Sequence, residues 1–297
     1  MGADSPDRRV PDKRINAYRD DLAAESLRAK VDVPNYTKGE MRQVVAAAAP
    51  LRHAPRFDAV LKTQVLHGES VVVYDENEGW AWAQANRDAY VGYIPSDALK
   101  NEIITPTHRV SALCTHIYPA PDIKVPPLDL LSMNAHLSVA EEMGSFSKLT
   151  DGRFALASHL VPAADFAEDF VSVAQKFFGI PYLWGGRTNS GLDCSALIQI
   201  SLQSTGIACP RDTDMQEAAL GTALPDPHDQ SAYARGDLIF WSGHVGVMLD
   251  ETRLLHANAH HMATAIEPVG QAIERIADSE GQVTSVRRGA DDTERNN

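Results

Sequence analysis

A cysteine at the start of an apolar run is the first residue that could do chemistry. Cys194 follows an acidic residue in "SGLDCSAL", and the run "CSALIQISLQSTG" has the spacing of a helix that ends at Gly206. A thiol at a helix N-terminus faces unpaired backbone N–H groups, whose field favours the nucleophilic thiolate. We therefore predict that Cys194 is a nucleophile with a depressed pKa. The alternative is a small hydrophobic residue in the core.

A nucleophilic thiol needs a base, and the 11 histidines supply the candidates. His244 begins the β-like run "HVGVML", and His256 ends the run "RLLH" 12 residues later. In an antiparallel hairpin the start of one strand lies beside the end of the next. The spacing therefore predicts His244 as the base and His256 as its orienting partner. A hydrogen-bonded polar residue at a strand end is the alternative for His244.

The remaining cysteines and histidines give weaker signals. Cys114 and Cys209 belong to no CxxC pair, so we expect them to be inert thiols. The sequence "HANAHH" brings His256, His260 and His261 together and suggests a metal site as an alternative. Because no cysteine or carboxylate with ligand spacing joins these histidines, we expect no metal and no cofactor.

Composition and charge limit the possible partners. The chain has 297 residues and a formal net charge of −13, and its 44% hydrophobic and 23% charged residues are typical of soluble globular proteins. The negative charge argues against binding to nucleic acid or to anionic membrane surfaces. The N-terminal segment lacks the apolar run of a secretory signal, and no segment has the length of a membrane span. We therefore expect a cytoplasmic protein, whose oligomeric state is left open.

Short β-like runs dominate the first half of the chain. Within residues 41–104, "SVVVY", "WAWAQ" and "YVGYI" are separated by turn sequences, and such even spacing is typical of a small barrel. The sequence "FSKLTDGRFALASHLVPA" repeats this scheme within residues 105–162. We predict two small barrels in tandem. A polar segment, residues 1–40, precedes them and has helical spacing over residues 15–29.

Residues 163–287 have a different pattern. The sequence "ADFAEDFVSVAQKFFG" ends at Gly179 and places one apolar stripe at helical spacing: Phe166, Phe170, Val173, Ala174 and Phe177. The helix that begins at Cys194 comes next, followed by the β-like runs "DLIFW", "HVGVML", "RLLHAN" and "ATAIE". Helices followed by antiparallel strands predict an α+β domain. We expect residues 288–297 to be a disordered tail.

Five linked motifs carry a resemblance to a known family. The motifs "YLWGGRTNSGLDCSAL", "CPRDTDMQ", "ARGDLIFW", "GHVGVML" and "LLHANAHHMAT" resemble those of the NlpC-type cell-wall peptidases, which are papain-like cysteine hydrolases. One departure is Ala196, where the family usually has glycine. The resemblance implies that Cys194 is the nucleophile, His244 the general base and His256 the orienting group. It also implies that the Tyr182 hydroxyl donates to the developing oxyanion; a packed core aromatic is the alternative.

The resemblance also implies a substrate. The family hydrolyses amide bonds in peptidoglycan peptides, commonly between γ-D-glutamate and a diamino acid. The N-terminal half resembles bacterial SH3-like domains, and in a subgroup with two such barrels the first one closes the cleft. Acidic groups in that subgroup hold the free amino terminus of L-alanine, because a desolvated ammonium needs carboxylates around it. The matching substrate-binding residues here are Glu69, Tyr90, Asp193, Ser195 and Asp212. For Glu69 a solvated turn carboxylate is the alternative.

We therefore expect a papain-like catalytic domain behind two SH3-like barrels, acting as a γ-D-glutamyl-L-diamino acid endopeptidase. Its substrate would be a peptidoglycan-derived peptide with a free N-terminal L-alanine, as in cell-wall peptide recycling. Two alternatives stay open: a peptidoglycan-binding protein with little or no hydrolysis, and an acyltransferase of the papain-like superfamily. The diamino acid at the cleaved bond is left open.

Overall fold

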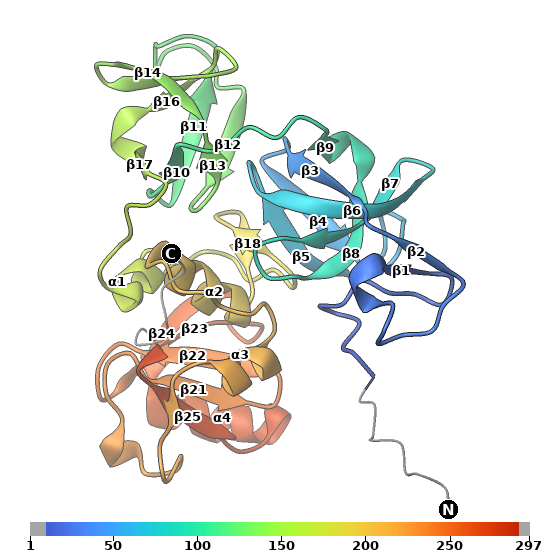
Figure 1. The fold of residues 1–297 in the computed structure, drawn as a ribbon. Coiled ribbons are helices and arrows are strands. Elements are labelled where there is room, and N and C mark those ends of the chain that lie inside the picture. The colour runs from blue at the N-terminus through green and yellow to red at the C-terminus, as the bar shows by residue number, and fades with distance from the viewer. Residues whose placement is uncertain (1–9, 291–297) are drawn as a thin grey trace, which may run out of the picture. The chain divides into compact units, whose positions relative to one another are not determined.

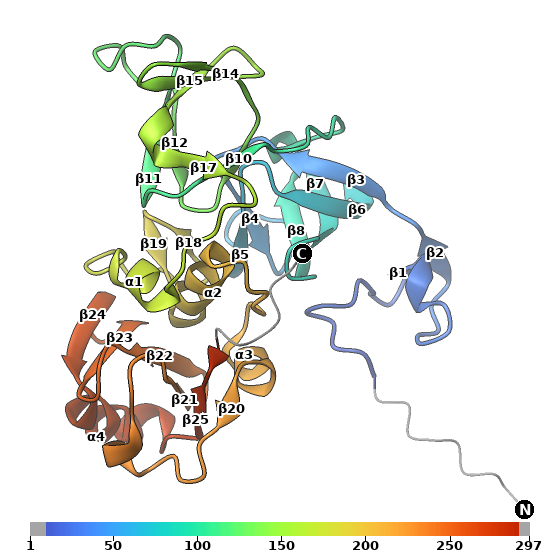
Figure 2. The ribbon, with the colours of Figure 1, turned by 60° about the vertical axis from the view of Figure 1, so that its left-hand side comes forward.

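The computed structural model describes residues 10–290, and its contacts divide the chain into two units. The first unit ends at Ile104 and the second begins at Thr105. Figure 1 and Figure 2 show that strands predominate in both units, with a few short helices in the second. None of the helices within residues 10–290 is long and apolar enough to cross a membrane.

The first unit opens with an irregular segment that packs on its sheet. The segment contains β1 (Leu22–Ala24), the 3₁₀ turn η1 (Glu25–Leu27) and β2 (Asn35–Thr37). The helix expected over residues 15–29 is therefore wrong. The segment folds against the sheet instead, because its apolar residues Ala17 and Leu27 pack on Trp82, and the Val91 N–H donates to the Arg14 carbonyl. These tertiary contacts outweigh a weak local helical preference.

A seven-stranded antiparallel sheet forms the body of the first unit. Its strands follow the order β5-β4-β8-β7-β6-β3-β9. They are β3 (Glu40–Val44), β4 (Ala48–Arg52), β5 (Leu61–Leu66), β6 (Ser70–Asn77), β7 (Trp80–Ala85), β8 (Val91–Pro95) and β9 (Leu99–Lys100). The 3₁₀ turn η2 (Ser96–Ala98) links the last two. Alternate residues such as Leu51, Val65 and Val71 fill the core, as the period of a half-buried strand requires.

The second unit begins with two small sheets. One has the order β13-β10-β17, from His136–Leu137, His108–Val110 and Leu160–Pro162. The other has the order β12-β11-β16-β15-β14, from Asp129–Ser132, Cys114–Tyr118, Phe154–Leu156, Phe146–Leu149 and Val139–Met143. The succession β15, turn, β16, 3₁₀ turn η3 (Ala157–His159) and β17 repeats the succession β7, turn, β8, η2 and β9. The loose sequence repeat therefore reflects the same order of elements.

The remainder of the second unit is a sheet with helices on both faces. The helices are α1 (Phe170–Gln175), α2 (Cys194–Ser204), α3 (Thr213–Ala219) and α4 (Val269–Glu280), with a 3₁₀ turn η4 (Gln230–Ala232). The hairpin of β18 (Arg187–Thr188) and β19 (Gly191–Leu192) precedes α2. The antiparallel sheet has the order β20-β25-β21-β22-β23-β24. Its strands are Thr222–Ala223, Ser285–Arg288, Leu238–Trp241, His244–Met248, Arg253–Asn258 and Ala263–Pro268.

The pleat of this sheet separates two apolar layers. Leu238 and Phe240 pack with α1 and α2, whereas the alternate residues Ile239 and Trp241 pack with α4. The four β-like runs predicted in this region are confirmed as strands. The helix predicted from Cys194 is confirmed as α2, and all of its residues are buried. This domain is α+β, with its helices against an antiparallel sheet.

Two predicted boundaries in the second unit need correction. The stripe from Phe166 to Phe177 forms a helix only from Phe170, because Asp169 accepts a hydrogen bond from the Val171 N–H and caps the helix there. The predicted tail begins later than residue 288, since Arg288 of β25 pairs with Thr222 of β20 and Ala290 is fully buried. The rest of that prediction, residues 291–297, lies outside the described residues.

Candidate active site

Cys194 is the first residue of α2 and lies against the start of β22. Asp193 caps the helix, since its Oδ1 accepts the Ala196 N–H at 2.9 Å. The Cys194 Sγ lies 3.9 Å from the carbonyl oxygen of Gly243, which directly precedes His244. The cap fixes where the helix begins, and the contact with Gly243 brings the thiol to the strand end that carries the expected base.

Burial makes Cys194 a neutral thiol at rest. Only 6% of the residue is exposed, and burial together with the adjacent Asp193 carboxylate raises the pKa of Cys194 to about 12. The Val245 N–H, the Thr213 side chain and Arg211 favour the thiolate but do not outweigh burial. The predicted depression of the pKa is therefore wrong, because loss of water outweighs the hydrogen bonds and the Arg211 charge that favour the thiolate.

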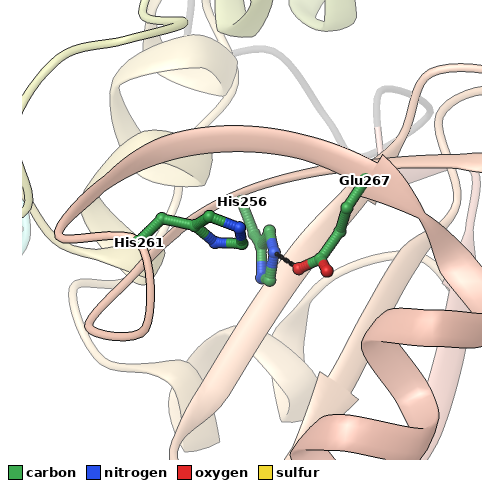
Figure 3. A group of neighbouring side chains, drawn as sticks. All are labelled: His256, His261 and Glu267. Carbon is green, nitrogen blue, oxygen red and sulfur yellow. Dashed lines mark hydrogen bonds and ion pairs between the residues drawn. The ribbon is translucent and has the colours of Figure 1, made fainter.

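A chain of hydrogen bonds leads away from His244. Its Nε2 lies 2.8 Å from Nδ1 of His256. On the other side of the ring, His256 Nε2 lies 2.7 Å from Oε1 of Glu267, the hydrogen bond drawn in Figure 3. Arg275 on α4 donates to the same Oε1. His244 is at the start of β22, His256 is on β23 and Glu267 is on β24. Each of these three successive strands therefore supplies one of the three hydrogen-bonded side chains.

The hydrogen-bonded side chains of His244, His256 and Glu267 lie on the face of the sheet that α4 covers. Leu254 belongs to the apolar cluster that packs on α4, and alternation places His256, two residues later, on the same face. Glu267 lies opposite Leu254 in the antiparallel register of β23 and β24. His256 is fully buried and His244 is 5% exposed, so water has little access to either ring.

The electrostatics of the chain follow from burial and pairing. Burial, together with the smaller effects of His256 and Arg275, lowers the pKa of His244 to about 3 against the opposing effect of Glu267. Burial also lowers the pKa of His256, against the opposing effect of Glu267. For Glu267, burial alone would raise the pKa, but His256 and Arg275 outweigh burial and hold it at about 2. At neutral pH the site therefore holds a neutral thiol, two neutral imidazoles and one ionised carboxylate.

Tyr182 approaches this site from the segment before β18. It is half-buried, forms a parallel bridge with Leu192, and donates its backbone N–H to the Met262 carbonyl at 3.0 Å. Its side chain packs against the apolar cluster that contains Cys194. Burial raises the pKa of the Tyr182 phenol, and the negative charge of Asp193 adds to the shift. The phenol is therefore a protonated donor near the thiol.

Asp193 and Ser195, which flank the nucleophile, are bound inside the domain. Arg211 donates to both Asp193 oxygens, at 2.9 and 2.6 Å, and to the Ser195 Oγ at 2.7 Å. The Gly185 N–H donates to Asp193 Oδ2 at 2.9 Å. The guanidinium thus neutralises the carboxylate expected to hold an ammonium. Asp212 is half-buried at the N-cap position of α3.

Glu69 and Tyr90 belong to the first unit and are described within it. Glu69 is 4% exposed; its Oε2 accepts the Leu66 N–H at 2.9 Å, and its Oε1 lies 2.5 Å from Nε of Arg87. The alternative of a solvated turn carboxylate is therefore wrong for Glu69. Tyr90 is 4% exposed in the core of the sheet, and the Lys62 ammonium lies 5.6 Å from its ring centroid.

The same chain of hydrogen bonds accounts for a group of possible metal ligands. One ligand atom each from His256, His261 and Glu267 lies within 4.8 Å of the others (Figure 3). Both nitrogens of His256 already bond, one to His244 and one to Glu267. His261 Nδ1 lies 3.0 Å from Oδ1 of Asn258. A metal at this position would have to displace the hydrogen bond that orients His256.

Comparison with known proteins decides the family. Residues 179–275 match the NlpC/P60 family, and residues 51–99 match the bacterial dipeptidyl-peptidase Sh3 domain. The chain is 31% identical over 224 residues to the gamma-D-glutamyl-L-lysine dipeptidyl-peptidase of Bacillus subtilis (strain 168), which covers 67% of this chain and 73% of that protein. This chain belongs to the NlpC/P60 family. It is therefore a cysteine peptidase, a hydrolase, with an SH3 domain.

Two further proteins are similar to this NlpC/P60 peptidase over most of its length. Dipeptidyl-peptidase 6 of Lysinibacillus sphaericus is 26% identical over 239 residues, which cover 72% of this chain and 86% of that protein. The crystal structure of an NlpC/P60 family protein from Bacillus cereus superposes with a TM-score of 0.69 at 21% identity and covers 84% of this chain and all of that one. The second comparison shows the fold.

Sequence reasoning about this NlpC/P60 peptidase missed three charged residues of the site. Arg211 follows Cys209 and Pro210 in "CPRDTD", and only the fold brings its guanidinium to Asp193. Glu267 interrupts the apolar run "ATAIEP", and a carboxylate in a strand of that kind is a signal that could have been noticed. Arg275 stands on α4, a helix absent from the prediction, so no local pattern pointed to it.

Proposed function

We propose that the chain hydrolyses the amide bond between γ-D-glutamate and a diamino acid in peptidoglycan-derived peptides. The observation that carries the proposal is the contact of the Cys194 Sγ, at the start of α2, with the carbonyl of Gly243, directly before His244, whose ring is hydrogen-bonded to His256. Relatives named gamma-D-glutamyl-L-lysine dipeptidyl-peptidase support the choice of bond.

The proposed reaction passes through a thioester. The Cys194 sulfur attacks the amide carbonyl carbon while His244 accepts the thiol proton. His244 then gives that proton to the leaving amine as the C–N bond breaks. Water, deprotonated by His244, cleaves the thioester and restores the thiol. Backbone N–H of Cys194 and the Tyr182 hydroxyl would donate to the oxyanion.

Burial favours a concerted proton transfer over a resting ion pair. A thiol whose pKa is raised to about 12 does not ionise spontaneously beside an imidazole whose pKa is lowered to about 3. The thiol proton should therefore move to His244 as the sulfur attacks, when charge passes to the carbonyl oxygen. We accordingly assign His244 the role of a general base in the attack.

A free N-terminal L-alanine is the second part of the proposal. The relatives' name, dipeptidyl-peptidase, describes release of a dipeptide from an amino terminus, and an ammonium removed from water needs acceptors around it. Within the second unit, the residues proposed for that role are Asp193, Ser195 and Asp212. Arg211 already pairs with Asp193 at 2.6 Å, so an ammonium bound there would share that carboxylate with the guanidinium.

The biological role follows from that specificity. An enzyme that requires a free L-alanine amine would act on peptides already trimmed from the wall and would leave intact wall uncut. We therefore propose cell-wall peptide recycling in the cytoplasm. Cell fractionation with antibody detection tests the location directly, and recovery of the protein only outside the cytoplasm would contradict it.

The deciding experiment is mass spectrometry of defined peptides. L-Ala-γ-D-Glu-L-Lys and its meso-diaminopimelate counterpart, each with and without an N-acetyl group, are incubated with the full chain. We expect release of L-Ala-γ-D-Glu from the free peptides, none with Cys194→Ser, and normal release with Cys209→Ser, a second buried cysteine. Absence of cleavage by the wild type would refute the hydrolysis. Equal cleavage of acetylated peptides would refute the amine requirement.

A further inference from the structure

The chain of hydrogen bonds behind His244 ends at two residues that the triad does not include. Glu267 Oε1 accepts from Nε2 of His256 at 2.7 Å and also from the guanidinium of Arg275. We propose that Glu267, held in place by Arg275, is a positioning residue that fixes which nitrogen of His244 carries the proton. The proposal rests on the proposed roles of Cys194 and His244.

The first step follows from what a carboxylate can do. An ionised carboxylate only accepts hydrogen bonds, and Arg275 keeps Glu267 ionised by donating to its Oε1. The His256 nitrogen that faces Glu267, Nε2, must therefore carry a hydrogen. His256 is fully buried and neutral, so its other nitrogen, Nδ1, carries a lone pair.

The position of the proton on His256 then fixes the position of the proton on His244. Nδ1 of His256 can only accept, so the His244 nitrogen 2.8 Å away, Nε2, must be the donor. Nδ1 of His244 is then unprotonated and is the nitrogen able to take the thiol proton. With the carboxylate absent, His256 could turn its hydrogen toward His244. That arrangement would move the His244 proton to Nδ1 and block the base.

Arg275 offsets the effect that the negative charge of Glu267 would have on the pKa of His244. Glu267 raises the pKa of His244 and Arg275 lowers it, so the two charges oppose each other at the base. Besides Glu267 and Arg275, the titratable side chain of His261 acts on His256 and lowers its pKa. A net-neutral Glu267–Arg275 pair can therefore set the direction of the hydrogen bonds while leaving His244 neutral and able to accept a proton.

Three variants separate this role from a merely structural one. Glu267→Gln keeps Oε1, the oxygen that accepts hydrogen bonds from both His256 and Arg275. In this variant Arg275 holds the amide so that its oxygen, not its nitrogen, faces His256. Glu267→Met removes the acceptor at similar volume. Glu267→Gln/Arg275→Met keeps the amide but releases its orientation. Glu274→Met, on the exposed face of α4, is the matched control.

The tautomer is read directly by ¹⁵N–¹H spectra of histidine-labelled protein at pH 7, which need no substrate. We expect Nε2–H on both His244 and His256 in the wild type, in Glu267→Gln and in Glu274→Met. In Glu267→Met we expect a mixture that includes Nδ1–H on His244. Because a base in the wrong tautomer cannot act, kcat for the free peptide should fall roughly 10²-fold in Glu267→Met while KM changes little.

Rescue by the conservative variant completes the test. Glu267→Gln should keep kcat within about threefold of the wild type, and the double variant should lose kcat as Glu267→Met does. Wild-type tautomers and wild-type kcat in Glu267→Met would overturn the proposal. If that variant does not fold, the soluble double variant decides by the same spectra. A wild type that cleaves no peptide would refute the proposed function, whereas the spectra would still decide the inference.

Discussion

The ion pair beside the nucleophile gives the clearest prediction for stability. Arg211 has a side chain 1% exposed and donates twice to Asp193, whose side chain is 11% exposed. Arg211→Met keeps an unbranched side chain of similar length but removes every donor. The Asp193 carboxylate then stays buried with only the Gly185 and Ala196 N–H groups and the Ser195 hydroxyl as partners. Breaking a buried pair by removing one partner costs about 3–5 kcal/mol.

The remaining donors place the expected cost at the lower end, about 3 kcal/mol. For a unit of this size each kcal/mol lowers Tm by about 2–4 °C, so Arg211→Met should unfold about 6–12 °C earlier. Asp193→Asn/Arg211→Met should recover part of this loss, because no buried charge is then left unpaired. Arg211 also lowers the pKa of Cys194, so Arg211→Met should reduce turnover as well.

The assay is urea and thermal unfolding followed by circular dichroism, with peptide turnover measured on the same samples. Arg253→Met is the control, because Arg253 forms its ion pair with Asp250 while its side chain is 56% exposed. An exposed pair of this kind contributes about 1 kcal/mol or less. If Arg211→Met costs no more than Arg253→Met, or if the double variant is no better than Arg211→Met, the reasoning about a buried charge is wrong.

Four other outcomes are expected. His244→Ala should lower kcat by several orders of magnitude, and His256→Ala should lower it less, since an orienting group contributes less than the base; near-normal turnover of His244→Ala would mean the base is elsewhere. Because burial lowers the pKa of His244 from 6.5 to about 3, the neutral base persists in weak acid, and kcat/KM should hold from pH 7 down to about 5; an acid limb near 6.5 would contradict this. Because the pKa of Cys194 is raised to about 12, its alkylation by iodoacetamide should accelerate about tenfold per pH unit between pH 7 and 9, and a plateau would contradict the assignment. A Cβ on Gly246 would lie 2.8 Å from Leu254 Cδ1 and 3.1 Å from His256 Cβ, so Gly246→Ala should displace His256 and lower kcat about tenfold or more. Gly270→Ala is the control and should leave kcat unchanged, because the nearest atom to its Cβ would be Gln230 Oε1 at 3.4 Å.

The sequence predicted what local patterns determine. The helical spacing of the apolar run that begins at Cys194 located α2 and its cysteine, and hairpin geometry paired His244 with His256 across β22 and β23. The segment over residues 15–29 was mispredicted because Trp82, far along the chain, supplies the surface on which it folds. Local spacing contains no information about such a partner.

Two features of the site could not be read from spacing. The direction of the Cys194 pKa shift depends on how much water the fold removes, and 6% exposure reverses the effect expected from the helix terminus. The pairing of Glu267 with Arg275 needs the register of β23 and β24 and the placement of α4 over that face. Both are consequences of tertiary packing, which the local spacing of residues does not display.

The distribution of charge around Cys194 and His244 indicates when the site becomes reactive. Asp193 is paired with Arg211 at one end, and Glu267 with Arg275 at the other, so both buried carboxylates are compensated. The thiol and imidazole between them are neutral, and separating their charges at rest would create two uncompensated charges away from water. A substrate carbonyl removes that difficulty, because attack moves the negative charge onto an oxygen that the Cys194 N–H and Tyr182 can stabilise. We therefore expect acylation by a bound peptide to be fast under conditions in which alkylation of the empty site is slow.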